Sequence, residues 1–464
     1  MKFRIYAVAL LALLVVLAGC QSGSALSEPP VSEISSRSEA SVSVPERTQR
    51  TVEGVVHISE EPGQFTIETE EGLLTFSDRQ LPSGTVHEGA VAQVTYWFSE
   101  DDKAAPEAVS LTEIQKAPMW AEYFSEADRI LEQMTLEQKV GQIFFIRCAD
   151  TSGQAVEDIR NWNPGGVLLF ARDFQNKNAQ QVIDTISAYQ EASALPLLIG
   201  ADEEGGTVVR VSANPLLREE RFQAPGELYR SGGLEALTAD AQEKSRLLLS
   251  LGVNVNLAPV CDVSSDPSDY IYPRALGEDA QTTASYVSAV TAVMKQEGIG
   301  CVLKHFPGYG SNRDTHTGIA YDTRPYQQFL EEDFLPFQAG IEAGAGCVLV
   351  SHNIVESMDR ERPASLSPRV HEILRETLGF EGVILTDDLM MDAIGQYTDG
   401  ASAAVQAVQA GNDMLIVTDY SSQIPAVISA VRDGTLDEAQ IDAAARQVLC
   451  WKLSLGLLAD GRSE

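Results

Sequence analysis

The chain has 464 residues, enough to bury a large core and to form more than one domain. Its hydrophobic fraction of 44% and its charged fraction of 22% are ordinary for a globular protein. Its formal net charge of -34 is unusual, and a surface so negative repels phosphate groups. We therefore expect no nucleic-acid partner, and the very soluble surface of a secreted protein is the simpler explanation of the charge.

The first twenty residues have the pattern of a signal peptide rather than of a membrane-spanning helix, with Lys2 and Arg4 ahead of a short apolar stretch. The ending LAGC at residues 17–20 resembles the lipobox of bacterial lipoproteins, in which the signal is removed before a cysteine that is then acylated. The resemblance predicts a signal peptide over residues 1–20 and a lipid anchor on Cys20. The protein would then lie outside the cytoplasm, attached to the cell membrane through lipid. A signal peptide cut at another position is the alternative.

Residues 21–50 are rich in Ser, Glu and Pro and nearly lack large apolar side chains, so we expect a disordered tether. Residues 51–115 contain short segments of alternating polarity separated by Gly, Pro and Asp turns. This pattern predicts a small all-β module, plausibly a five-stranded barrel of the oligonucleotide/oligosaccharide-binding type. Without an aromatic and basic face, the module is best interpreted as a spacer.

From residue 116 to 464 the pattern changes to apolar runs that alternate with longer amphipathic stretches, such as 234–251 and 326–343. The spacing Thr135-x-x-Gln138 is a capping signal for a helix that leads into the first run. Eight such runs predict an α/β domain with a (β/α)8 barrel, whereas a doubly wound sheet lacks support because no Gly-rich phosphate loop follows the first run. The runs are 142–146, 166–170, 196–200, 253–257, 300–303, 346–350, 382–385 and 413–417.

Polar residues follow the apolar runs directly, and in a parallel barrel all those strand ends lie on one face. Residues two hundred positions apart can therefore converge on one site. The residues concerned are Asp202, Asp262, Lys304, His305, His352, Asp387 and Asp419.

This set of residues suits the cleavage of a glycosidic bond, which needs a proton donor for the leaving oxygen and a carboxylate for the anomeric carbon. Asp387 can supply the carboxylate. His316 can supply the proton, because Asp314, two residues away, can fix its tautomer and stabilise its cation. Asp388, the second acid of the pair, is better interpreted as a capping or supporting group.

Other residues after the runs can hold sugar hydroxyls. Lys304, His305 and Arg274 would donate hydrogen bonds to them, and Asp202 would accept two. An ion pair between Asp202 and Arg274, or a local ion pair of either residue, is an equally good explanation of those two residues.

Four segments together resemble glycoside hydrolase family 3, in its β-N-acetylhexosaminidase branch. The segments are ADEEGG to Arg210, LGVNVNLAPV to Arg274, KHFPGYG with DTH, and TDDLMM, and the resemblance covers roughly residues 120–455. It implies a retaining exo-hydrolase that removes terminal β-linked N-acetylglucosamine from peptidoglycan or related glycans. By position it makes Asp387 the nucleophile, His316 the acid/base and Asp314 its partner. It also implies sugar contacts from Asp202, Arg210, Arg274, Lys304 and His305.

The chain departs from the family pattern at Tyr309, where members usually carry His, and the loop from Gly310 to Asp314 looks short. Both departures bear on the leaving-group side rather than on the mechanism. The β-glucosidase branch takes its acid/base from a second, C-terminal domain, and we expect none after the helix at 437–454. The loop histidine should therefore do that work.

Several alternatives remain open. A β-N-acetylglucosaminide phosphorylase fits, because a histidine acid/base does not repel an incoming phosphate, and a β-glucosidase of the same family is also possible. A zinc hydrolase built on His305, His316, His352 and Asp387 lacks the early His-x-His pair, and a non-catalytic sugar-binding lipoprotein would not need the nucleophile and acid pair. We expect no metal and no cofactor. The cysteines after Cys20 follow no metal-ligand spacing and are expected to be buried.

Overall fold

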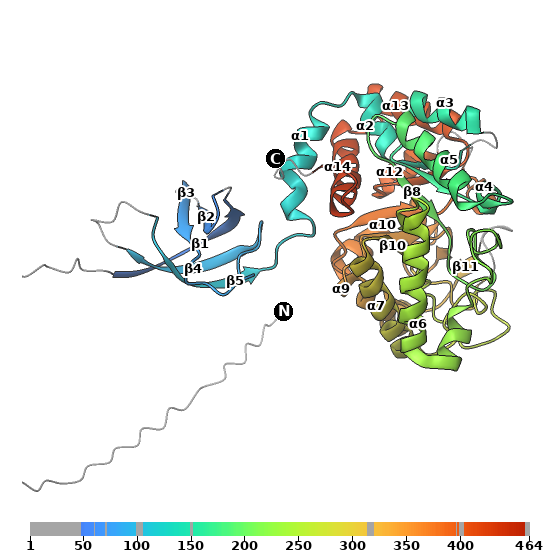
Figure 1. Ribbon diagram of the computed structural model, residues 1–464, viewed down its shortest axis with the longest axis horizontal. Helices are drawn as coiled ribbons and strands as arrows, with labels where there is room; N and C mark the ends of the chain where they lie inside the picture. Colours follow the sequence, from blue (N-terminus) through green and yellow to red (C-terminus); the bar gives the residue numbers. More distant parts are fainter. Residues whose placement is uncertain are drawn as a thin grey trace, which may run out of the picture.

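The computed structural model describes residues 48–59, 61–69, 72–98, 105–148, 152–312, 320–395, 397–398 and 403–459. A five-stranded antiparallel sheet lies to one side of an eight-stranded parallel sheet with helices around it (Figure 1). Cys20 and most of the proposed tether lie outside the described residues. In the described part of the chain, none of the helices combines the length and apolar character that crossing a membrane requires.

The small sheet confirms the β module that the alternating segments predict. Its order is β3-β2-β1-β4-β5, and a parallel bridge between Ser77 and Glu107 joins its two edges, as in a partly closed five-stranded barrel. Its strands are β1 (Thr48–Ile58), β2 (Gln64–Thr69), β3 (Gly72–Ser77), β4 (Val91–Phe98) and β5 (Ala108–Gln115). β1 begins inside the stretch that was expected to be tether. Alternate side chains such as Phe65, Ile67 and Val94 form a core of their own.

The large sheet is the predicted (β/α)8 barrel. Its strands are β6 (Phe144–Ile146), β7 (Gly166–Leu169), β8 (Leu198–Ala201), β9 (Val255–Asn256), β10 (Gly300–Phe306), β12 (Cys347–Val350), β14 (Val383–Thr386) and β15 (Leu415–Val417). They pair in parallel in chain order, and β15 pairs with β6. The bridge between Leu385 and Met414 brings β14 beside β15 and completes the ring. Each strand overlaps one of the eight apolar runs.

Alternation along the strands divides the barrel core into two layers. Side chains such as Phe145, Leu168 and Leu198 pack inside the ring, whereas their neighbours pack outward against the helices. Gly200 is needed for this packing, because a Cβ there would lie 2.5 Å from the ring of Phe145. The inside of the barrel is therefore a packed core, and any site must lie at its ends.

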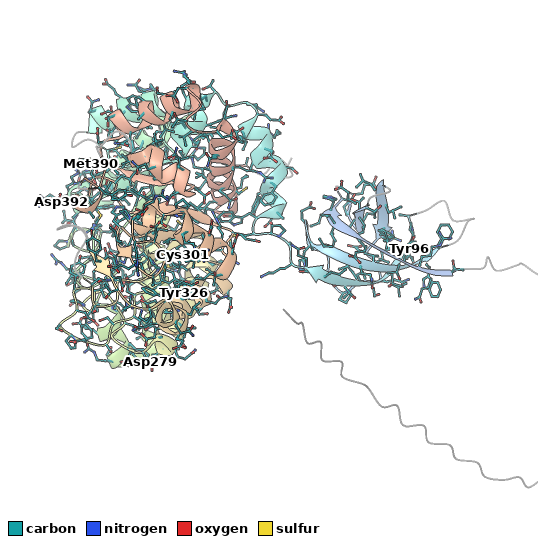
Figure 2. The ribbon with its side chains drawn as sticks, turned by 180° about the vertical axis from the view of Figure 1, so that it is seen from behind. Tyr96, Asp279, Cys301, Tyr326, Met390 and Asp392 are labelled. Carbon is teal, nitrogen blue, oxygen red and sulfur yellow. The ribbon has the colours of Figure 1, made fainter. Side chains whose placement is uncertain are left out.

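The helices between the strands begin at the expected capping residues. Thr135 and Gln138 form the predicted capping box of α2, and Asp279, labelled in Figure 2, accepts a hydrogen bond from the Thr282 backbone N–H at the start of α7. The helix expected over 234–251 is longer, because α6 starts at Pro225 and bends at Gly233, whose φ of 62° suits glycine.

The helical bounds are η1 (Ala121–Tyr123), α1 (Phe124–Leu131), α2 (Leu136–Gln142), α3 (Ser152–Trp162), α4 (Ala171–Phe174), α5 (Ala179–Ala192), α6 (Pro225–Ser250), α7 (Ala280–Glu297), α8 (Tyr326–Gln328), η3 (Phe329–Asp333), α9 (Phe334–Glu342), η4 (Ala364–Leu366), α10 (Pro368–Glu372), η5 (Ile373–Thr377), α11 (Asp392–Gly395), α12 (Ala403–Ala410), α13 (Tyr420–Arg432) and α14 (Glu438–Ser454). Two short strands, β11 (Tyr321–Asp322) and β13 (Ile354–Val355), pair with each other outside the barrel.

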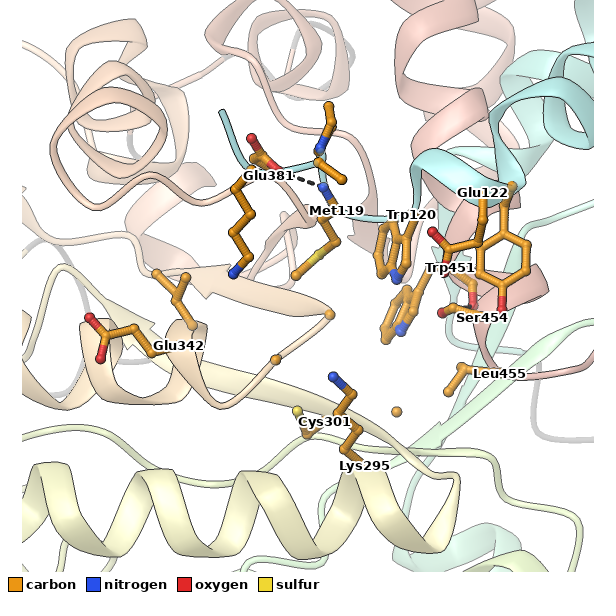
Figure 3. A pocket seen from close by; sticks show the side chains of 18 of the residues that line it. Met119, Trp120, Glu122, Lys295, Cys301, Glu342, Glu381, Trp451, Ser454 and Leu455 are labelled. Atoms are coloured by element: carbon orange, nitrogen blue, oxygen red, sulfur yellow. Dashed lines mark hydrogen bonds between the residues drawn. The ribbon is translucent and has the colours of Figure 1, made fainter. Parts of the chain in front are cut away.

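Two tryptophans close the amino-terminal end of the barrel. Trp120, on the segment that links the two sheets, and Trp451, from α14, both approach Gly346, where a side chain would collide with Trp451. They line a cavity of about 740 Å³ (Figure 3). Packing at this end of a (β/α)8 barrel contributes to stability. Catalysis in such barrels takes place at the opposite end.

The cysteines of the described residues are free and buried, as the sequence predicts. Burial raises the pKa of the Cys148 thiol to about 12, so this side chain is a neutral, inert thiol at physiological pH. The five residues are Cys148, Cys261, Cys301, Cys347 and Cys450.

Candidate active site

The carboxyl ends of the barrel strands surround a cavity of about 520 Å³. The described residues to which the sequence assigns a catalytic or sugar-binding role all line it, namely Asp202, Arg210, Arg274, Lys304, His305 and Asp387, whereas Asp262, His352 and Asp419 are not among its lining residues. They come from the segments after β8, β9 and β14 and from the end of β10, so the barrel brings together positions nearly two hundred residues apart. Asp314 and His316 lie outside the described residues.

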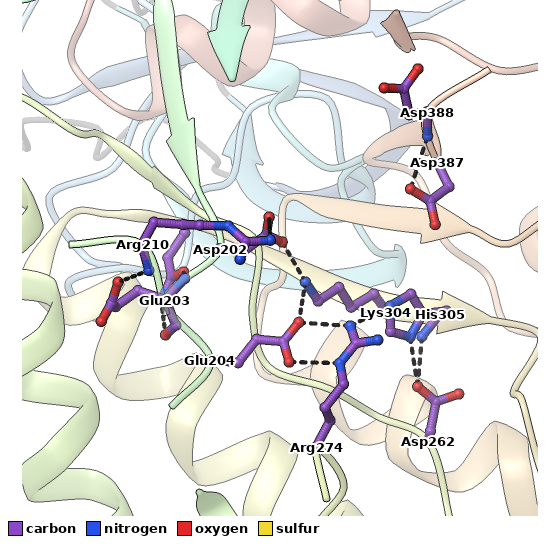
Figure 4. Close-up of polar contacts among 11 residues, drawn as sticks. Asp202, Glu203, Glu204, Arg210, Asp262, Arg274, Lys304, His305, Asp387 and Asp388 are labelled. Atoms are coloured by element: carbon purple, nitrogen blue, oxygen red, sulfur yellow. Dashed lines mark hydrogen bonds and ion pairs between the residues drawn. The ribbon is translucent and has the colours of Figure 1, made fainter. Parts of the chain in front are cut away.

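Glu204 links two of the predicted cations, although the sequence analysis gave it no role. Its buried carboxylate accepts hydrogen bonds from Arg274, 2.9 Å from Nε and 2.8 Å from Nη2. Lys304 Nζ lies 2.6 Å from Glu204 Oε1 (Figure 4). Arg274 therefore pairs with Glu204, so a mutual ion pair between Arg274 and Asp202 is wrong, whereas each of the two residues does form ion pairs with other charged neighbours.

Asp202 forms the outer part of the same network. Lys304 Nζ donates to Asp202 Oδ1 at 2.8 Å, and Arg210 Nη2 donates to Oδ2 at 3.1 Å. Burial alone would raise the pKa of Asp202, but the charges of Lys304 and Arg210 outweigh it, and the pKa lies below its ordinary value. Asp202 is therefore an ionised acceptor at the edge of the cavity.

The same balance of effects keeps Glu204 ionised. Burial opposes its charge, and the neighbouring charges of Arg274 and Lys304 more than compensate, so its pKa lies well below the usual range. The pKa of Arg274 is correspondingly raised by Glu204 despite burial. These groups form a fixed cluster of opposite charges, in which Arg274 Nη1 makes no hydrogen bond to any described residue and remains available to a ligand.

His305 is held as one tautomer by two neighbours. Its Nδ1 lies 2.7 Å from Asp262 Oδ2, and its Nε2 lies 2.9 Å from Arg274 Nη2. A guanidinium only donates, so Nε2 accepts and the proton is on Nδ1, where it is donated to Asp262. Neither ring nitrogen donates into the cavity in this arrangement. In this arrangement His305 Nε2 contacts Arg274, and the expected role of His305 in sugar binding stays a prediction.

Asp262 is itself fixed by the backbone at the end of β10 and just after it. Its carboxylate accepts hydrogen bonds from the backbone N–H groups of His305, at 3.2 Å, and Tyr309, at 2.8 Å. The Lys304–His305 and Phe306–Pro307 peptide bonds in this segment are cis. Asp262 therefore sets both the path of the KHFPGYG segment and the state of its histidine.

The two adjacent acids after β14 have different surroundings. Asp388 Oδ2 accepts from Thr418 Oγ1 at 2.6 Å, and its Oδ1 accepts from the Met390 backbone N–H at 3.0 Å. Asp387 Oδ1 accepts only from the Asp388 backbone N–H, at 2.8 Å, and its Oδ2 has no hydrogen bond to any described residue. Asp388 is therefore a supporting group, as expected, while Asp387 offers a free carboxylate oxygen to the cavity.

Arg324 contacts both sides of residues 313–319, which the structure leaves undescribed. Its guanidinium donates to the Gly308 carbonyl at 3.3 Å and to Asp322 Oδ2 at 2.8 Å. It also donates to the buried Asp333 at 2.7 Å. This network joins the described residues on either side of the segment that contains the predicted Asp314 and His316.

The described histidines near the cavity are engaged within the protein. His352 Nδ1 lies 2.7 Å from Ser365 Oγ, and its Nε2 lies 3.1 Å from the Asp388 carbonyl. With His305 bound to Asp262 and Arg274, neither ring of this pair presents a nitrogen to a metal ion. Among the described residues, no group of three or more His, Cys, Asp and Glu side chains is arranged as a metal site.

Comparison with known proteins shows the family to which this chain belongs. Residues 135–450 match the model of the glycosyl hydrolase family 3 N-terminal domain. The chain belongs to this family. It is a glycoside hydrolase, and the four segments that carry the resemblance in the sequence all fall inside the matched region.

Relatives with assigned names and solved structures agree with this placement. A β-hexosaminidase of Stenotrophomonas maltophilia (strain R551-3) is 36% identical over 310 residues, which are 64% of this chain and 88% of the relative. The structure of a family 3 β-N-acetylglucosaminidase from Paenibacillus sp. str. FPU-7 superposes with a TM-score of 0.66 at 28% identity, covering 71% of this chain and 64% of that one. A β-N-acetylhexosaminidase from Beutenbergia cavernae DSM 12333 superposes with a TM-score of 0.59 at 29% identity, covering 68% of this chain and 98% of that one.

Proposed function

We propose that the protein is a retaining exo-β-N-acetylhexosaminidase that removes terminal β-linked N-acetylglucosamine. The observation that carries the proposal is the free carboxylate oxygen of Asp387, which faces a cluster of hydroxyl-binding charges across one cavity. The nucleophile follows β14, whereas the sugar-binding groups come from the segments after β8 and β9 and from the end of β10. The named relatives and structures support the hexosaminidase specificity.

In the first step Asp387 attacks the anomeric carbon and forms a glycosyl-enzyme, while the leaving oxygen takes a proton. We assign the proton donor to His316, with Asp314 as its partner, from the DTH segment of the sequence. In the second step the same imidazole takes a proton from water, which displaces Asp387. The two inversions leave the released sugar in the β configuration.

Sugar binding is assigned to the charged cluster. Arg274 Nη1 and the third proton of Lys304 Nζ are available as donors, and Asp202 can accept at the mouth of the cluster. Glu204 and Asp262 act behind them, because they hold Arg274, Lys304 and His305 in place. A terminal sugar with free hydroxyls would satisfy this cluster, which supports exo action.

The competing activities differ in what the enzyme needs. With the 4-nitrophenyl β-glycosides of N-acetylglucosamine and glucose, we expect turnover of the first and little of the second. A β-glucosidase would reverse this preference. Adding phosphate should leave the rate unchanged and give no sugar 1-phosphate, which a phosphorylase would produce. A protein that only binds sugar would turn over neither glycoside.

We further propose that the glycan is peptidoglycan or a related polymer, met outside the cytoplasm by a protein anchored through Cys20. The support is the lipobox and the strongly negative composition of the chain. Cys20→Ser should move the protein from the membrane fraction to the soluble fraction of the native host. Retention of Cys20→Ser in the membrane would exclude the lipid anchor and leave the catalytic proposal intact.

A further inference from the structure

Arg324 is a partly buried cation that supports the active-site segment without entering the cavity. It follows β11 and is not among the described residues that line the cavity. Its guanidinium donates to two buried carboxylates, to Asp322 Oδ2 at 2.8 Å and to Asp333 Oδ2 at 2.7 Å. It also lies over the ring of Phe329, 4.2 Å from the ring centre. The function proposed above assigns Arg324 no role.

Two glycines bring the active-site segment against this ion pair. Gly308 and Gly310 have positive φ angles of 118° and 52°, a region that suits glycine. A Cβ at Gly308 would collide with the carboxylate of Asp333, and a Cβ at Gly310 would lie 2.5 Å from Arg324 Cζ. Arg324 Nη2 also donates to the Gly308 carbonyl at 3.3 Å. The backbone of residues 308–310 therefore lies directly on the pair of Arg324 and Asp333.

The contacts of Arg324 extend to the end of the described segment. Asn312 Nδ2 donates to Asp322 Oδ2 at 2.7 Å, and the same oxygen accepts from Arg324 Nη2. Asp322 Oδ1 accepts from the Arg324 backbone N–H at 2.9 Å. The carbonyl of Gly308 and the side chain of Asn312 are thus tied to one cluster of charges, made of Arg324, Asp322 and Asp333.

The same stretch of backbone carries part of the cavity wall. Tyr309, between the two glycines, lines the cavity and packs edge-on against the ring of His305, with the ring centres 5.1 Å apart. The Tyr309 backbone N–H donates to Asp262, which also holds His305. His305 contacts Arg274, one of the proposed sugar-binding cations. A displacement of this backbone would therefore reach the sugar site through Tyr309 and His305.

We propose that Arg324 is a positioning residue for the sugar site, and that it holds residues 305–312 in the shape that places Tyr309 and His305 at the cavity. Without the guanidinium, the buried carboxylates of Asp322 and Asp333 would face each other unneutralised beneath the segment. Removing one partner of a buried ion pair is costly, so this part of the structure would rearrange to admit water. The inference rests on the proposed function for the identity of the sugar.

Arg375 provides a matched comparison at the opposite end of the barrel. Its guanidinium pairs with the buried Asp413 at 2.6 Å and donates to the backbone carbonyls of Phe380, at 2.9 Å, and Gly382, at 2.6 Å. It also lies over the ring of Phe380, 5.6 Å from the ring centre. Arg375 and these partners are not among the described residues that line the active-site cavity. Arg375 thus has contacts of the same kinds as Arg324 but does not support the active-site segment.

The test measures KM for 4-nitrophenyl N-acetyl-β-glucosaminide and the inhibition constant of N-acetylglucosamine. Arg324→Met should raise both constants by about 10- to 100-fold, the scale expected for losing a charged hydrogen bond. Arg324→Lys should raise them less, because it restores the charge without the planar fork. A variant that was only less stable would lose kcat with its folded fraction and keep both constants, since only folded molecules bind.

Arg375→Met should lose stability and keep both constants near the wild-type values. Wild-type constants in Arg324→Met would overturn the inference, as would an equal rise of the constants in Arg375→Met. If Arg324→Met does not fold, Arg324→Lys decides, because wild-type constants in that variant would also overturn the inference. In each of these cases the hexosaminidase activity stands. Absence of turnover of every N-acetylglucosaminide by the wild type would instead contradict the proposed function itself.

Discussion

Replacing Glu204 by Gln tests whether the buried charge cluster builds the sugar site. The substitution keeps the size of the side chain but changes one carboxylate oxygen into an NH2 group. Oε1 faces Arg274 Nη2 and Lys304 Nζ, and Oε2 faces Arg274 Nε. Whichever position the NH2 group takes, it meets a donor, so at least one charge-assisted hydrogen bond is lost.

The expected size of the effect follows from these contacts. A hydrogen bond to a charged group is worth about 1.5–3 kcal/mol, and each 1.36 kcal/mol corresponds to about a tenfold change in rate. If this energy positions Arg274 and Lys304 for the transition state, kcat/KM should fall by about 10- to 150-fold. The assay is hydrolysis of 4-nitrophenyl N-acetyl-β-glucosaminide, together with unfolding in urea.

Asp413→Asn is the matched control for a buried acid that pairs with arginine. Asp413 precedes β15, and its Oδ2 accepts from Arg375 at 2.6 Å and from the Ile384 backbone N–H at 2.7 Å, at the opposite end of the barrel. This variant should lose stability but keep kcat/KM near the wild-type value. A Glu204→Gln enzyme with wild-type kcat/KM would refute the reasoning, since it would show that the cluster does not position the sugar-binding cations.

Three further changes have expected outcomes. Asp262→Asn should lower kcat/KM about tenfold, because it weakens the hydrogen bond that fixes the tautomer of His305; an unchanged rate would show that this bond is irrelevant to sugar binding. Burial lowers the pKa of Lys452 to about 7, so between about pH 7 and 10 the unfolded chain binds more protons and stability rises with pH. The free energy of unfolding in urea should therefore rise between about pH 7 and pH 10 by more in the wild type than in Lys452→Met. An equal rise in both proteins would contradict the lowered pKa of Lys452. Treatment with a chelator should not change activity, because the described imidazoles of His305 and His352 are engaged in the protein; loss that zinc restores would support the metal-hydrolase alternative.

Most of the fold could be predicted from the sequence because the barrel strands are short apolar runs with clear limits. The capping box at Thr135 was predictable for another reason, because its two hydrogen bonds join residues only three positions apart. The fifth strand of the small sheet, Ala108–Gln115, is hard to identify from the sequence alone, because several of its residues are exposed and its apolar alternation is weak. The early start of α6 depends on a bend at Gly233, which the spacing of apolar residues along the sequence does not indicate.

The candidate site could be predicted only in part. Position at or just after the end of an apolar run was enough to predict that Asp202, Lys304 and Asp387 share one cavity, because the carboxyl ends of the barrel strands lie on one face. The partners of these residues depend on side-chain packing between distant segments, so the pairing of Arg274 with Glu204 was missed. One signal was present, because residues 202 and 204 are two apart and share a side of an extended segment. The roles of Asp314 and His316 stay predictions.

Trapping the glycosyl-enzyme is the measurement that tests the central claim most directly, because the account rests on Asp387 as the nucleophile. A slow fluorinated N-acetylglucosaminide analogue should label the peptide that contains Asp387 and Asp388, and fragmentation should place the label on Asp387, whose free oxygen faces the cavity. Asp387→Asn should be folded, almost inactive and unlabelled. Label on Asp388, or a first product in the α configuration, would contradict the account.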